Sequence, residues 1–155
     1  FPTRRSSDLK VSHDAINPCG YLIKNEGEAL LYMTDTGLFL DECLEYVKNP
    51  TYLIIESNHD LKMLYQSKRS LTLKTRIASE RGHLSNEDSA LIAKDIIGDK
   101  TKEIVLAHIS EECNTPELAI KAYQKVFSYF NIDINRYNLR VANQNYSLIG
   151  GDYEN

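Results

Sequence analysis

The sequence lacks any apolar run approaching the roughly 20 residues that a membrane-spanning helix needs. Its N-terminus also lacks the apolar core of a secretory signal. These two absences predict a soluble, cytoplasmic chain with no membrane partner. Cysteine is scarce as well, because Cys19, Cys43 and Cys113 lie far apart, are odd in number and form no C-x-x-C pair. Neither a disulfide framework nor a thiolate zinc site is therefore expected.

Internal repeats and low-complexity linkers are also missing from the chain. With 155 residues and 42% hydrophobic content, the sequence is long and apolar enough for one folded core. We therefore expect a single globular unit.

The first nine residues, FPTRRSSDL, match one reading frame of a common sequencing-adapter oligonucleotide. They are either an artefact of that origin or a genuine basic, Ser-rich arm. We favour the artefact and predict that residues 1–9 lie outside the fold, that the domain occupies 10–149, and that 150–155 form a tail. On this interpretation the coding sequence was broken upstream of Lys10, and the fold need not begin at a domain boundary.

Positive charge is concentrated in one segment of a chain whose formal net charge is −4. Residues 61–82 contain six basic residues against one acid, Glu80, a local net charge of +5. A basic segment in an acidic protein suits a site that takes phosphates, although an ordinary solvated loop and helix face would look the same. The basic residues are Lys62, Lys68, Arg69, Lys74, Arg76 and Arg81.

Strand and helix patterns alternate along the chain, which predicts a mixed α/β fold, α+β in some schemes. Ser85 and Thr115 are expected N-caps, with Pro116 at the first helical position, and Gly98 is expected to end its helix in a left-handed conformation. Strands are predicted over 10–14, 20–24, 29–33, 52–55 and 103–107, helices over 39–47, around 63, and over 73–79, 86–97 and 116–130, and a closing hairpin over 137–142 and 146–149.

The four histidines all fall at predicted element ends or in loops, where a scaffold presents functional groups. His13 and His108 are near strand ends, His59 follows a strand, and His83 precedes a capped helix. Each alone has a structural interpretation, as a semi-buried imidazole or a turn or cap residue. Together with Asp35, which ends another strand, they are candidates to converge.

Neutral imidazoles combined with a carboxylate suit zinc, manganese or iron, and a carboxylate can bridge two metals. Asp35 is the natural bridge on this hypothesis. Its alternative role is to cap the turn that begins in Thr34-Asp35-Thr36-Gly37.

Three sequence blocks, His13-Asp14-Ala15 with Pro18-Cys19-Gly20-Tyr21, Tyr32 to Gly37, and Leu106 to Ser110, resemble the later motifs of metallo-β-lactamase-fold hydrolases in order and spacing. Two more, Glu56-Ser57-Asn58-His59-Asp60 and Gly82 to Asn86, resemble the YycJ/WalJ group, related more distantly to tRNase Z, RNase J and cyclic-phosphate phosphodiesterases. The resemblance implies the C-terminal half of an αββα metallo-β-lactamase sandwich.

The resemblance also implies roles for individual residues. His13 and His108 correspond to ligands of two different divalent metals, zinc or manganese, and Asp35 to the catalytic bridge between them. His83 corresponds to a catalytic histidine that contacts the scissile phosphate or protonates the leaving group. His59 would orient a ligand or the substrate, with Asp60 or Glu56 as its partner.

The family's signature His-x-His-x-Asp-His, which supplies most of the metal ligands, is absent from this chain. Each metal would keep one terminal histidine and the shared aspartate, fewer than the three protein ligands usual at open sites. We therefore expect the partner to be a missing N-terminal half of the same domain, the fragment to be inactive, and an apolar edge to be exposed where that half would pack.

For the intact parent, these observations predict two-metal hydrolysis of phosphodiester bonds in a nucleic acid, DNA or RNA. The substrate would contact His59 and the basic residues Lys62, Lys68, Arg69, Lys74 and Arg76. Two alternatives stay open. One is a thioesterase or lactamase-like hydrolase of the same fold, which needs no basic track, and the other is a non-catalytic nucleic-acid-binding module.

Overall fold

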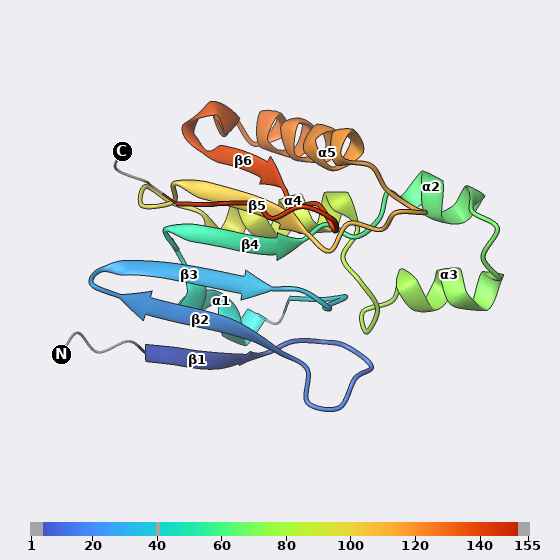
Figure 1. The fold of residues 1–155 in the computed structure, drawn as a ribbon, viewed down its shortest axis with the longest axis horizontal. Coiled ribbons are helices and arrows are strands. Elements are labelled where there is room, and N and C mark those ends of the chain that lie inside the picture. Colours follow the sequence, from blue (N-terminus) through green and yellow to red (C-terminus); the bar gives the residue numbers. More distant parts are fainter. Residues whose placement is uncertain (1–4, 40, 152–155) are drawn as a thin grey trace.

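A six-stranded mixed sheet forms the centre of the computed structural model, which describes residues 5–39 and 41–151 (Figure 1). The strands lie in chain order: β1 (Arg5–Lys10), β2 (Cys19–Asn25), β3 (Glu28–Met33), β4 (Tyr52–Glu56), β5 (Glu103–Ala107) and β6 (Asn138–Val141). The first three pair antiparallel, and β3 to β6 are parallel. The predicted mixed α/β class is confirmed.

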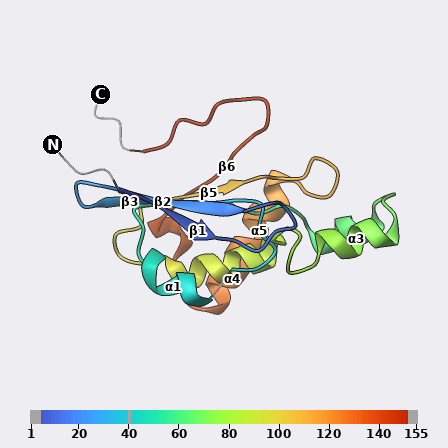
Figure 2. The ribbon, with the colours of Figure 1, turned by 90° about the horizontal axis from the view of Figure 1, so that it is seen from below.

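Helices cover one face of this sheet (Figure 2). They are α1 (Asp41–Val47), α4 (Asn86–Ile96) and α5 (Pro116–Tyr129), and a 3₁₀ turn (Ile134–Arg136) leads into β6. Alternate strand residues point toward them, as the register of Leu31 with Leu53 and of Leu53 with Ile104 illustrates. All three side chains are fully buried. The two-residue period of the strands therefore builds one core, between sheet and helices.

The opposite face of the sheet carries apolar side chains but no helix among the described residues (Figure 2). Tyr21 and Ile23 of β2 are 42% and 43% exposed, and Tyr32 of β3 is 38% exposed. The C-terminal segment 142–151 crosses part of this face and encloses a groove of about 700 Å³. Apolar surface is thus exposed on a face of the sheet, whereas the sequence predicted it at an edge.

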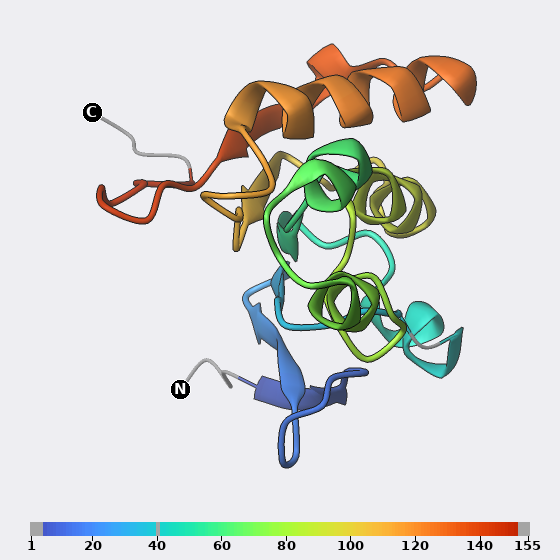
Figure 3. The same cartoon turned by 90° about the vertical axis from the view of Figure 1, so that its right-hand side faces the viewer.

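Two short helices, α2 (Leu61–Gln66) and α3 (Leu71–Ile77), project beyond the carboxyl ends of the parallel strands (Figures 1 and 3). Each begins at a cap whose side chain accepts a hydrogen bond from a backbone N–H three residues on, Asp60 for α2 and Ser70 for α3. The predicted caps Ser85 and Thr115 are confirmed in the same way. None of the helices described over 5–39 and 41–151 is both long and apolar enough to cross a membrane.

The first strand departs from the prediction. The strand expected over 10–14 lies instead over Arg5–Lys10, where Leu9 pairs with Gly20 and Lys10 with Cys19. Part of the segment expected outside the fold is therefore an edge strand, while residues 1–4 lie outside the described residues. Strand pairing uses main-chain groups that any non-proline sequence supplies, so the origin of the segment stays a prediction.

The closing hairpin is also not formed, because β6 pairs parallel with β5 and residues 146–149 form no strand. Tyr146 and Leu148 instead line the groove on the open face. Of the predicted tail, Gly151 donates its N–H to Glu103 Oε2 at 2.9 Å, and 152–155 lie outside the described residues. The segment after β6 is therefore placed by the contacts of Tyr146 and Leu148 in the groove and by the hydrogen bond from Gly151 N–H to Glu103.

Gly98 does not take the left-handed conformation expected of it, since it is not among the glycines with positive φ. The absence of a side chain at Gly98 instead permits the side chain of Asn49 to pack closely against its backbone. A Cβ at this position would come within 2.6 Å of Asn49 Oδ1.

Candidate metal and phosphate site

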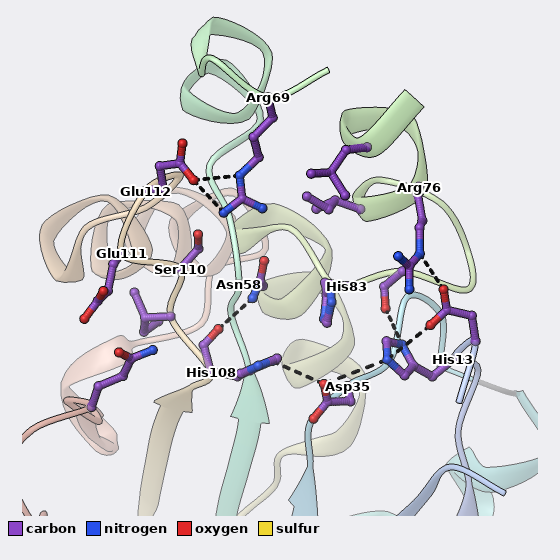
Figure 4. Close-up of a pocket in the computed structure, with 16 residues that line it drawn as sticks. His13, Asp35, Asn58, Arg69, Arg76, His83, His108, Ser110, Glu111 and Glu112 are labelled. Carbon is purple, nitrogen blue, oxygen red and sulfur yellow. Dashed lines mark hydrogen bonds and ion pairs between the residues drawn. The ribbon is translucent and has the colours of Figure 1, made fainter. Parts of the chain in front are cut away.

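The carboxyl ends of β1, β3, β4 and β5 meet at one edge of the sheet, because β1 runs parallel to β3 through two antiparallel pairings. His13 follows β1, Asp35 follows β3 and His108 follows β5 (Figure 4). His83 reaches the same place from the segment between α3 and α4. The four side chains line one pocket of about 570 Å³. The convergence expected from the sequence is thus present.

Asp35 lies between the two outer histidines. Its Oδ1 is 3.9 Å from His13 Nε2 and 3.8 Å from His108 Nδ1. The His83 ring lies between the other two imidazoles, with ring centroids 5.1 Å from His13 and 5.2 Å from His108. Thr36, rather than Asp35, closes the turn by donating to Leu38 O. The carboxylate of Asp35 therefore faces the pocket.

Two of these residues have backbone conformations that L-amino acids rarely adopt. Asp35 has φ 53° and His108 has φ 56°. A non-glycine residue in this region costs roughly 1 kcal/mol or more, and such strain concentrates at functional sites. In both cases the conformation turns the chain sharply at the end of a strand. The strand ends therefore aim the two side chains at a common point.

Glu56, at the end of β4, is fully buried and contacts two histidines of this cluster. Its Oε1 accepts hydrogen bonds from His83 Nδ1 at 2.8 Å and His108 Nδ1 at 2.6 Å, and its Oε2 accepts from Thr36 N–H at 2.9 Å. Burial alone would raise the pKa of Glu56, but these hydrogen bonds outweigh burial and hold its pKa below the ordinary value. The same bond from His108 raises the pKa of that imidazole.

Sequence reasoning offered Glu56 only as a possible partner of His59, and this was wrong. The sequence did hold a signal for the correct role. Glu56 ends an apolar strand, and strands also end shortly before His13, Asp35 and His108, so its carboxylate could have been expected beside these histidines. A buried carboxylate must find donors, and His83 and His108 are the nearest ones.

His13 is held in the same manner by a different acceptor. Its Nδ1 lies 3.0 Å from the carbonyl oxygen of Gly82, which can only accept, so this nitrogen carries the proton. The Nε2 lone pair is then left to face two carboxylates, Asp14 Oδ1 at 3.5 Å and Asp35 Oδ1 at 3.9 Å. His13 and His83 thus share one tautomer, fixed by a carbonyl in one case and a carboxylate in the other.

Two arginines of the predicted basic segment line the pocket, and each is paired with a carboxylate across it (Figure 4). Arg69 Nε and Nη2 donate to Glu112 Oε2 at 2.9 and 2.8 Å. Arg76 Nε donates to Asp14 Oδ2 at 2.5 Å, a bond that lowers the pKa of Asp14. Neither carboxylate was predicted, because only the folded chain brings residues so far apart in sequence together.

The other basic residues proposed for substrate contact lie elsewhere. Lys68 and Lys74 do not line the pocket, and Lys74 Nζ donates to Tyr65 O. Lys62 lines a separate groove between α2, α4 and α5, together with His59. Lys62 lies on α2 and Lys68 in the link between α2 and α3. Lys74 and Arg76 are two residues apart on α3, about 200° around the helix, so they point to opposite sides.

His59 is 1% exposed, and neither of its ring nitrogens has a hydrogen-bond partner in the described part of the chain. Its backbone instead connects β4 to α4, because the Asn86 N–H donates to His59 O at 2.9 Å. The expectation that His59 orients a ligand or substrate therefore needs correction. It is a buried imidazole outside the pocket, and burial lowers its pKa to about 4.

The donors gathered in the pocket suit a divalent transition metal. Imidazole nitrogens with a carboxylate oxygen are the usual ligands of zinc and of manganese. The ligand atoms of His13, Asp35 and His83 all lie within 4.8 Å of one another. The hydrogen bonds to Gly82 and Glu56 supply the outer contacts that orient metal-binding histidines. The residues present therefore fit such an ion.

A sheet with helices on one face and a histidine–aspartate cluster at its strand ends defines a class of proteins. Residues 1–109 match the β-lactamase superfamily domain, and the chain belongs to the metallo-β-lactamase superfamily.

Particular relatives are known. The chain is 41% identical to the exodeoxyribonuclease YycJ of Bacillus anthracis over 116 residues, 75% of this chain and 44% of that protein. It is 41% identical to the exodeoxyribonuclease WalJ of Streptococcus pneumoniae serotype 2 (strain D39) over 109 residues, 70% of this chain and 40% of that protein. The chain thus spans less than half the length of these relatives.

Solved structures agree with this fold. The metallo-β-lactamase fold protein YhfI from Bacillus subtilis superimposes with a TM-score of 0.62 at 18% identity, over 91% of this chain and 47% of that one. The short form of human tRNase Z superimposes with a TM-score of 0.52 at 18% identity, over 70% and 36%. This chain therefore covers less than half of either of these solved structures.

The buried His59 generates a prediction for stability. Its pKa is about 4 in the folded chain against 6.5 ordinarily, so its contribution to stability is complete above pH 6.5 and is lost as the pH falls toward 4. The His59→Leu variant has no proton to gain and leaves no polar atom unpaired. We expect its stability advantage over the unmodified chain to widen by about 2–3 kcal/mol between pH 7.5 and pH 4.5.

Urea unfolding at the two pH values measures the free energy of unfolding of each protein. Groups that titrate alike in both proteins, including His108, cancel in the difference between them. An advantage that does not change with pH would show that His59 is not buried in its neutral form.

Proposed function

We propose that the complete protein is a metal-dependent hydrolase of phosphodiester bonds and that DNA is its substrate. The observation that carries this proposal is one pocket that joins three imidazoles and Asp35 to two arginines. The names of the YycJ and WalJ relatives, both exodeoxyribonucleases, support the choice of DNA over RNA.

We propose that His13, Asp35 and His108 hold two divalent ions, zinc or manganese, with Asp35 shared between them. Bound there, the ions would supply Lewis acidity to the phosphodiester. The remaining ligands would come from the part of the relatives' length that this chain does not span. For the 155-residue chain alone we expect no turnover, because each ion of this pair would have too few protein ligands.

We propose that His83 delivers a proton from Nε2 to the leaving oxygen. Its Nδ1 is held by Glu56 Oε1 at 2.8 Å, so the buried carboxylate would keep the ring oriented while Nε2 takes up a proton and releases it. This arrangement requires a substrate that approaches from the pocket side.

The two arginines would bind the phosphates that flank the scissile bond. A guanidinium binds a phosphate through two parallel hydrogen bonds, and Arg69 already engages Glu112 Oε2 through two nitrogens. A phosphate would replace each carboxylate. These two charges also separate the proposal from the same-fold alternative, because a thioesterase or lactamase-like hydrolase has no need of them.

The catalytic part of the proposal is tested with Asp35→Ala in the full-length parent. Removal of the shared carboxylate should reduce metal-dependent cleavage of single-stranded DNA and of bis-p-nitrophenyl phosphate by at least ~100-fold. Asp99→Ala is the matched control, because Asp99 is an exposed acid that pairs with Arg136 at the surface.

Equal activity in Asp35→Ala and Asp99→Ala would remove Asp35 from the site. Hydrolysis of a thioester in preference to both phosphodiesters would favour the same-fold alternative. DNA binding by the unmodified parent with no cleavage and no metal dependence would favour the binding module.

The phosphate contacts are tested by a pair of neighbouring substitutions. Glu111 and Glu112 both line the pocket, but only Glu112 pairs with Arg69. Glu112→Gln should therefore raise the affinity for single-stranded DNA more than Glu111→Gln, although both remove one negative charge. Arg69→Ala should lower the affinity and reduce the slope of log K against log salt by roughly 1.

Fluorescence anisotropy of a labelled oligonucleotide measures these affinities over a salt series, and Arg81→Ala serves as the control for loss of one positive charge outside the pocket. Equal effects of the two glutamate variants, or of the two arginine variants, would show that the pocket arginines do not bind the phosphates.

A further inference from the structure

Three ligand atoms converge without any contribution from outside the chain. They belong to His13, Asp35 and His83 and lie within 4.8 Å of one another. Around a tetrahedral ion with bonds of about 2.1 Å, ligand atoms are separated by ~3.4 Å. His13 Nε2 and Asp35 Oδ1 are 3.9 Å apart, so small side-chain rotations bring them to that separation.

The protonation of the two histidines already suits an ion. The Nδ1 of His13 donates to Gly82 O and the Nδ1 of His83 donates to Glu56 Oε1. Each imidazole therefore keeps its lone pair on Nε2, and each has the outer acceptor that makes a histidine a better ligand. His13 and His83 are also the two rings that lie 5.1 Å apart by centroids.

A competing set, Glu56, His83 and His108, meets the same 4.8 Å limit. In that set the two Nδ1 protons point at Glu56 Oε1, at 2.8 and 2.6 Å. An ion placed there would have to displace both protons and the hydrogen bonds that satisfy a fully buried carboxylate. The set that contains His13 and Asp35 loses no hydrogen bond to Glu56.

We propose that the chain by itself binds one divalent transition ion through His13 Nε2, Asp35 and His83 Nε2. Three protein ligands and one open position toward the pocket are the arrangement of an open zinc site. His83 is then a metal ligand in this chain, a role that the family resemblance does not give it. This binding concerns the chain by itself and depends on no reaction, whereas the proton transfer proposed for His83 Nε2 concerns the complete protein, in which this nitrogen would not hold an ion.

The test uses Asn substitutions, because the Asn side-chain nitrogen occupies about the position of histidine Nδ1 and can still donate to Glu56. His83→Asn removes only the Nε2 ligand, and His108→Asn is the matched control, since it changes the other imidazole on the same carboxylate. Zinc per chain is measured by mass spectrometry after dialysis. Cobalt(II) is titrated by its visible ligand-field absorption and by calorimetry.

We expect one ion per unmodified chain, a loss of affinity of at least ~10-fold in His83→Asn, and almost no loss in His108→Asn. Circular dichroism verifies that both variants are folded. No bound ion, two ions per chain, a larger loss in His108→Asn, or equal losses in both variants would each overturn the proposal. None of these results depends on nuclease activity, so failure here is distinguishable from failure of the proposed function.

Discussion

One buried carboxylate organises this end of the molecule. Glu56 terminates β4, in the middle of the parallel part of the sheet, and its two oxygens accept from three different segments of the chain. A charge without solvent is unfavourable unless it is fully hydrogen-bonded, so the burial of Glu56 requires His83, His108 and Thr36 N–H to stay in place. The functional side chains are therefore fixed by the desolvation of an acid that does not itself face the pocket.

The sheet topology explains why such a small chain can assemble the cluster. Parallel strands deliver their carboxyl ends to one edge, and the antiparallel start adds the end of β1 to the same edge. The helices α2 and α3 then extend beyond this edge (Figure 1), and Arg69 in the link between them and Arg76 on α3 lie over the cluster (Figure 4). The proposed metal ligands His13, Asp35 and His108 thus follow strand ends, whereas the proposed phosphate contacts Arg69 and Arg76 belong to the projecting segment that contains α2 and α3. This division suits a site in which the ligands stay rigid and the substrate contacts exchange partners.

The sequence predicted the mixed α/β class, most of the helices and the convergence of His13, Asp35, His83 and His108, because apolar periodicity and element ends are local signals. It failed where distant residues decide the outcome. The pairing of Glu56 with His83 and His108, and of Arg76 with Asp14, links positions far apart in the sequence. His59 looked like its three counterparts but lies behind the pocket, since the bridge between His59 and Ser85 turns this segment toward α4. The strand over Arg5–Lys10 was missed because residues 1–9 were assigned to an adapter artefact and set outside the fold, whereas main-chain pairing does not depend on the origin of a sequence.

The most direct test of this account is the tautomer of each pocket imidazole in the metal-free chain. Long-range proton–nitrogen NMR spectra at pH 8 distinguish a proton on Nδ1 from one on Nε2. We predict the Nδ1–H form for His13, His83 and His108, with loss of this preference at His83 and His108, but not at His13, in Glu56→Gln. Nε2–H forms at His13 and His83 in the unmodified chain would place protons where the ligand lone pairs must be, and would contradict the account.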